Sequence, residues 1–67
     1  MPVVECVLGD ATGTITVVFM GRRRVAGLVP GAHLTVEGMV GRHRGVAAIV
    51  NPEFSIRAAG EAGGAVS

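Results

Sequence analysis

The sequence has 67 residues, a formal net charge of +1 and a hydrophobic fraction of 49%. A chain of this length forms one small domain and buries only about 60% of the surface it exposes when unfolded, which excludes a two-domain enzyme. The apolar content and the low net charge exclude a wholly disordered chain. Twelve valines and eleven glycines favour strands joined by tight turns.

The single cysteine, Cys6, cannot form an internal disulfide, and no second cysteine gives a zinc-binding spacing. We therefore expect a cytoplasmic protein without metal or cofactor. The N-terminus lacks the pattern of a signal peptide, and the longest apolar run, residues 46–50, is too short to cross a bilayer. Membrane insertion and export are not expected.

Charge is unevenly distributed along the chain. Residues 1–10 carry a net charge of −2, residues 11–52 carry +4, and residues 53–67 carry −1. A basic middle between acidic ends predicts a basic stripe on the surface, which suits weak attraction to a polyanion.

The first half of the chain predicts two strands and a short helix. Residues 3–8 are β-branched and apolar apart from one glutamate, and they lead through a turn at residues 9–13 into an alternating strand over residues 14–20. Ile15, Val17 and Phe19 form the expected core face of that strand. Residues 22–29 place apolar side chains at helical spacing, which predicts a short helix.

The second half predicts a hairpin. Residues 33–40 alternate as a third strand, and residues 46–50 form a fourth strand that Asn51 and Pro52 bend or end. The polar segment between them, residues 41–45, is the expected basic tip. Residues 58–67 are small and lack periodicity, so they are predicted to be a disordered tail after a domain at residues 1–57.

The absence of strand–helix–strand alternation favours a small all-β Greek-key barrel. Two stretches, ECVLGDATGTITVVFMG and LVPGAHLTVEGMVGRHRGVAAIVNPEFSI, resemble the OB-fold nucleic-acid-binding domains of the tRNA-anticodon-binding type. They are similar to the wedge domain of branch-migration DNA helicases and to small actinobacterial OB-fold proteins. The resemblance covers residues 4–57, and its most specific parts are the turn at Asp10, the entry at Pro30 and Gly31, and the closing segment from Asn51.

One departure concerns strand number. OB-folds have five strands, whereas this sequence predicts four and lacks the first. Two strand edges of the barrel would then be unpaired, which invites pairing with another chain. Either a preceding strand is missing from the sequence, or a neighbouring copy closes the barrel.

The resemblance implies a role for the basic tip, because the loop joining the last two strands of an OB-fold contacts oligonucleotides. Arg42 and Arg44 would bind phosphate, and His43 would stack or donate a hydrogen bond. The alternative is a solvated hairpin end whose charges keep a strand edge soluble.

Two further groups are candidate contacts. Arg22, Arg23 and Arg24 follow the second strand, where at most one or two of them would contact a phosphate backbone, and a solvated helix start explains them somewhat better. Thr14 and Thr16 face away from the core side of the second strand and would floor the groove. Both phenylalanines are expected in the core, so stacking platforms are absent and binding is predicted to be weak and salt-sensitive.

Catalysis is not expected, because Cys6 lies in an apolar strand and the two histidines lack a ligand set or partner nucleophile. Two functional hypotheses remain. The first is a non-catalytic OB-fold module that binds single-stranded DNA, or RNA, as an accessory to recombination or repair. The second is an interaction module that pairs its open strand edges with a second copy or another protein and binds no nucleic acid.

Overall fold

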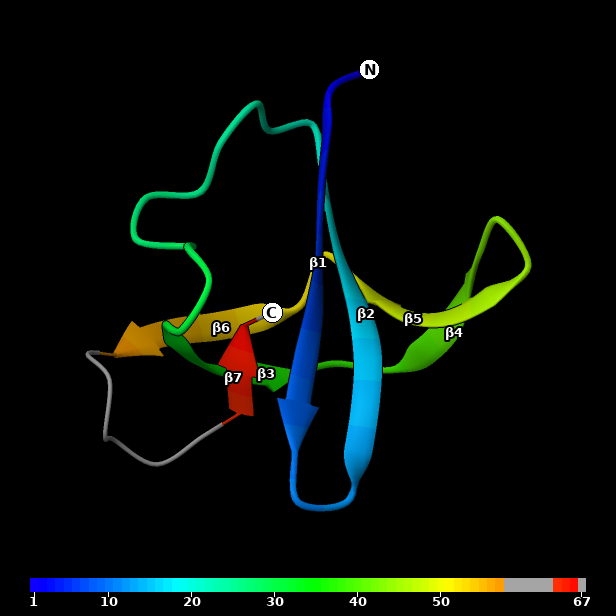
Figure 1. Ribbon diagram of the computed structural model, residues 1–67. Helices are drawn as coiled ribbons and strands as arrows, with labels where there is room; N and C mark the ends of the chain where they lie inside the picture. Colours follow the sequence, from blue (N-terminus) through cyan, green and yellow to red (C-terminus); the bar gives the residue numbers. More distant parts are fainter. Residues whose placement is uncertain (58–63, 67) are drawn as a thin grey trace.

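The computed structural model describes residues 1–57 and 64–66, which form a single seven-stranded sheet. These residues contain no helix, and hence none long and apolar enough to cross a membrane. The strand order is β4-β5-β2-β1-β7-β3-β6 (Figure 1). The strands are β1 Val3–Asp10, β2 Gly13–Met20, β3 His33–Glu37, β4 Val40–His43, β5 Val46–Val50, β6 Glu53–Arg57 and β7 Gly64–Val66.

The β1–β2 hairpin confirms the first two predicted strands. All eight residues of β1 pair antiparallel with β2, and a two-residue turn separates Asp10 from Gly13. Asp10 Oδ1 accepts hydrogen bonds from Thr12 Oγ1 at 2.6 Å and from Thr12 N at 2.7 Å. These bonds, the side-chain bond foremost, hold the pKa of Asp10 below its ordinary value. The predicted turn residue therefore fixes the hairpin.

A second, longer hairpin is built from four strands. β4 pairs with β5 and β3 pairs with β6, both antiparallel. Two residues lie between Glu37, at the end of β3, and Val40, at the start of β4. Their pairing partners, Glu53 and Ile49, have three residues between them, so the β5–β6 side carries one extra residue, as in a β-bulge. The single strand predicted over residues 33–40 is thus divided, and β6 is a strand that the sequence did not predict.

Three strand pairings join the hairpins. β2 runs parallel to β5, and β7 lies antiparallel between β1 and β3, where Val66 is opposite Leu8 and Gly64 is opposite Leu34 (Figure 1). A Cβ on Gly64 would lie 2.9 Å from the Leu8 side chain, so the close approach of β7 to β1 requires glycine there. Of the predicted tail at residues 58–67, residues 58–63 and 67 lie outside the described residues, and Gly64–Val66 form β7.

The predicted helix over residues 22–29 is absent, and residues 21–32 form an irregular loop. Gly27, in the middle of the expected helix, has a φ of 80°, which a right-handed helix does not allow. Leu28 N donates to Val25 O at 3.1 Å, which closes one isolated turn. The apolar spacing that suggested a helix instead directs Val25 and Leu28 from the loop into the core.

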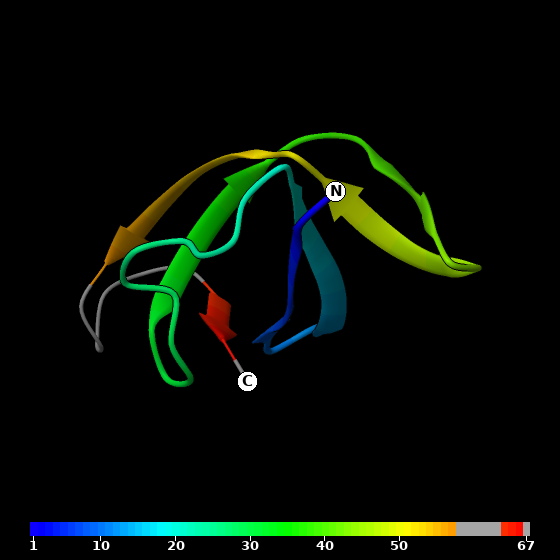
Figure 2. The same ribbon diagram turned by 90° about the horizontal axis from the view of Figure 1, so that it is seen from above.

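The core lies between the hairpins and this loop. Val17, Phe19 and Val25 are its buried centre, and the Phe19 and Phe54 rings meet edge to face with centroids 4.9 Å apart. This confirms Ile15, Val17 and Phe19 as the core side of β2 and both phenylalanines as core residues. Figure 2 shows a strongly curved sheet, with the β4–β5 hairpin extending to one side of the molecule.

Candidate nucleic-acid interface

A hollow of about 400 Å³ lies between the β1–β2 hairpin and the end of the β4–β5 hairpin. Thr16, His43 and Arg44, three residues predicted to contact nucleic acid, line it from different strands and turns. The lining residues are Glu5, Cys6, Val7, Thr16, His43, Arg44 and Val46. We call this feature the outer hollow.

The predicted tip is shorter in the structure than the sequence suggested. His43 pairs with Val46, so Arg44 and Gly45 alone form the turn, while Gly41, Arg42 and His43 belong to β4. Arg44 has a φ of 53° and Gly45 a φ of 79°, the conformation of a type I′ turn. An arginine with this left-handed backbone conformation lowers the stability of the fold by about 1 kcal/mol or more relative to a glycine at the same position. The chain holds a guanidinium at the rim of the outer hollow despite that cost.

Arg42 supports the turn. Its Nη1 donates a hydrogen bond to Gly45 O at 2.9 Å, which draws the guanidinium back over the tip. An arginine has five N–H donors, so one such bond leaves others for a ligand. Arg42 therefore stabilises the turn and also places a positive charge close to Arg44 in the sequence.

His43 lies against an acidic residue that sequence reasoning missed. Its Nε2 is 3.0 Å from Glu5 Oε1, at the distance of an ion pair but without the orientation of a hydrogen bond. The His43 side chain is 16% exposed, whereas that of Glu5 is 47% exposed. The available signal for Glu5 was its place as the one charged residue in the otherwise apolar segment 3–8.

Strands β1 and β2 form the floor of the outer hollow. Val7 pairs with Thr16 across the hairpin, which brings a methyl surface and a hydroxyl side by side. Cys6 also contributes to the lining, and burial raises the pKa of its thiol. The floor thus offers apolar contact and one hydroxyl, while the Cys6 side chain packs against the core.

The three consecutive arginines lie elsewhere. The Arg22 guanidinium carbon is 5.6 Å from the centroid of the Phe54 ring, a cation–π contact with the core. Arg23 and Arg24 line a separate hollow formed by the loop and Val4. The structure therefore does not bring these arginines together with Arg42 and Arg44.

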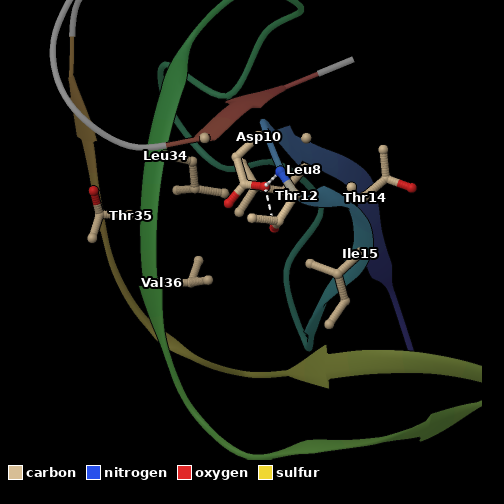
Figure 3. A pocket seen from close by; sticks show the side chains of 11 residues that line it. Leu8, Asp10, Thr12, Thr14, Ile15, Leu34, Thr35 and Val36 are labelled. Carbon is tan, nitrogen blue, oxygen red and sulfur yellow. Dashed lines mark hydrogen bonds between the residues drawn. The ribbon is translucent and has the colours of Figure 1, made fainter.

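Thr14 also lies outside the outer hollow. It borders a second cavity of about 380 Å³ between the β1–β2 turn and β3. In Figure 3 the side chains of Ile15, Leu34 and Val36 project into this cavity, and Thr14 projects away from it. Its walls are largely apolar, and its one charged side chain, Asp10, is bonded to Thr12. This cavity provides no cationic group for a phosphate.

Within residues 1–57 and 64–66, no three histidine, cysteine or acidic side chains are grouped closely enough to hold a metal ion. Comparisons with known protein families, curated proteins and solved structures find no match for this chain.

Proposed function

We propose that this chain is a non-catalytic OB-type module that binds single-stranded DNA through the outer hollow. The observation that carries the proposal is the convergence of Thr16, His43 and Arg44 on one hollow, from segments far apart in the sequence. In this role the domain holds an unwound strand for a separate recombination or repair enzyme, as the resemblance to helicase wedge domains implies.

The strand pairings support an OB-type barrel. Four of the strands act as two long bent strands, β3 with β4 and β5 with β6, because only two residues interrupt each pair. Counted in this way, the sheet has five strands, and β7 lies between β1 and β3. Four of their five pairings are antiparallel, and the β2–β5 pairing is parallel. In the proposed barrel, β7 occupies the position of the first strand of an OB-fold.

The position of the outer hollow also fits this fold. OB-folds bind oligonucleotides on the face of their second and third strands, next to the loop that joins the fourth and fifth. With β7 as the first strand, these features correspond to β1, β2 and the turn at Arg44 and Gly45. Those elements line the outer hollow.

The lining residues suggest how a strand is held. Arg44 binds phosphate oxygens, joined by the free donors of Arg42, which lies at the turn outside the lining. A base enters the hollow between the exposed methyl groups of Val7 and Val46. Thr16 offers a hydroxyl to the base or the sugar. Because the lining contains no phenylalanine, tyrosine or tryptophan, the stacking energy of about 1–3 kcal/mol that such rings provide for each base is missing. Binding is consequently weak and dominated by phosphate contacts.

A binding role is favoured over catalysis by the chemistry of Cys6. A nucleophilic cysteine needs a lowered thiol pKa, which cationic neighbours provide. Burial instead raises the pKa of Cys6, and the negative charge of Glu5 shares the same hollow.

Arg44→Asn tests the site with little risk to the fold. Asparagine tolerates positive φ and is favoured in type I′ turns, so the variant removes the guanidinium while keeping the hairpin. We expect weaker binding of a fluorescent single-stranded oligonucleotide, and a log–log slope of affinity against salt that falls by about 0.7 in magnitude for one lost phosphate contact. Fluorescence anisotropy over a salt series measures both.

Arg57→Gln is the matched control, because it removes one exposed positive charge from β6, outside the outer hollow. An equal loss of affinity in both variants would indicate general attraction to net charge and contradict the proposed site. If the folded wild-type chain binds no oligonucleotide at low salt, DNA or RNA, the binding function is wrong.

A further inference from the structure

We propose that the chain forms a two-fold dimer in which residues 37–43, the end of β3 through β4, pair antiparallel with the same segment of a second copy. Among the described residues, β4 ends the sheet and has β5 as its single strand neighbour. The proposal concerns the opposite edge of this strand and does not depend on nucleic-acid binding.

The turn determines which backbone groups face that edge. In a hairpin closed by a two-residue turn, the residues flanking the turn form a hydrogen-bonded pair, here His43 and Val46. Because the pattern alternates along an antiparallel ladder, the N–H and C=O groups of Val40 and Arg42 point away from β5. Two residues of β4 therefore present donors and acceptors to a further strand.

The side chains at this edge are apolar and exposed. Val40 is 61% exposed, and Met39, just before it, is 89% exposed. Edge strands in soluble proteins are usually protected by lysine, proline or an inward-pointing charge. β4 contains neither lysine nor proline, and the Arg42 guanidinium is bonded back to the turn rather than placed over Val40.

The charge pattern favours a second copy as the occupant. With the two-fold axis at Val40, each Val40 pairs with Val40 of the other copy, Arg42 lies opposite Gly38, and His43 lies opposite Glu37. This register places the acidic Glu37 opposite the imidazole of His43 and buries the apolar side chains at its centre. An axis at Arg42 would place two arginines face to face, so the Val40 register is preferred.

Sedimentation velocity over a concentration series tests the dimer. We expect the mass of the wild-type chain to rise from 6.8 kDa toward twice that value and to stop there, because a two-fold pairing closes on itself. Val40→Pro removes the outward N–H at the centre of the interface, and Val40→Lys charges it. Both variants are expected to stay monomeric.

Val29→Lys is the matched control, since Val29 is 57% exposed and lies in the loop between β2 and β3. It should dimerise like the wild-type chain. A folded wild-type chain that stays at 6.8 kDa at every concentration, a Val40→Lys variant that dimerises normally, or a mass that grows beyond two copies would each overturn the proposal.

Discussion

Asn51 links the two hairpins at the bend between β5 and β6. Its backbone is left-handed, with a φ of 49°, and its N–H donates to Val18 O at 2.7 Å. Its side-chain Oδ1 accepts a hydrogen bond from Met20 N at 2.8 Å. Asparagine satisfies both demands, because it tolerates this conformation and carries an acceptor of the required length.

Three substitutions at this position separate the two contributions. Asn51→Gly keeps the conformation and loses the side-chain hydrogen bond, so we expect it to cost about 1 kcal/mol of unfolding free energy. Asn51→Ala loses the bond and also strains the backbone, for a total of about 2 kcal/mol. Asn51→Asp keeps an acceptor and should stay closest to the wild type.

Urea unfolding followed by circular dichroism measures these differences, since the chain has no tryptophan or tyrosine to serve as an optical probe. If alanine were tolerated as well as aspartate, Asn51 would not be holding this corner.

The sequence predicted the roles of some individual residues and missed those of others. The alternation of β2 identified Ile15, Val17 and Phe19 as core residues, and the Asp10 turn was also predicted correctly. The contact of Glu5 with His43 was not predicted, because the two are 38 positions apart in the sequence and only the folded sheet brings them together.

At the scale of elements, β7 is the least expected part of the fold. It is three residues long, yet Val66 is buried, and its N–H donates to Ala32 O at 2.9 Å while its C=O accepts from Gly31 N at 2.8 Å. β7 therefore connects β1, β3 and the end of the loop that carries Val25 into the core.

Val66→Ala measures the contribution of β7. The loss of two buried methyl groups is expected to lower the unfolding free energy by about 1.5 kcal/mol. Val29→Ala makes the same chemical change at a site that is 57% exposed and should lie within about 0.5 kcal/mol of wild type. The midpoints of urea unfolding give both values, and equal midpoints for the two variants would mean that β7 does not pack as described.

The elements that the sequence predicted well are those with strong local patterns. β1, β2 and β5 combine β-branched residues with clear turn signals at their ends. The helix prediction failed because the spacing of Val25 and Leu28 is helical, whereas the conformation of Gly27 is not. β7 is short and forms through tertiary pairing, so no local signal distinguished it. β6 carries an alternating polar and apolar pattern over only five residues, and the sequence prediction missed it.

At the scale of the whole molecule, the basic middle of the chain does not form one stripe. The fold divides its arginines between the loop after β2, where Arg22 lies over Phe54, and the end of the β4–β5 hairpin, where Arg44 borders the outer hollow. The sequence did not reveal this division, because both groups of arginines lie within the same basic segment, residues 11–52. In the proposed function, phosphate contacts are therefore expected at the end of the β4–β5 hairpin.

A ¹H,¹⁵N NMR titration with a short single-stranded oligonucleotide tests the central claim most directly. It is performed at a protein concentration where sedimentation shows a single species. We predict chemical-shift changes at Val7, Thr16, Arg44 and Gly45 that added salt reverses, with little change at Arg23 and Arg24. Dispersed spectra that ignore the oligonucleotide, or shifts confined to the loop after β2, would contradict binding at the outer hollow.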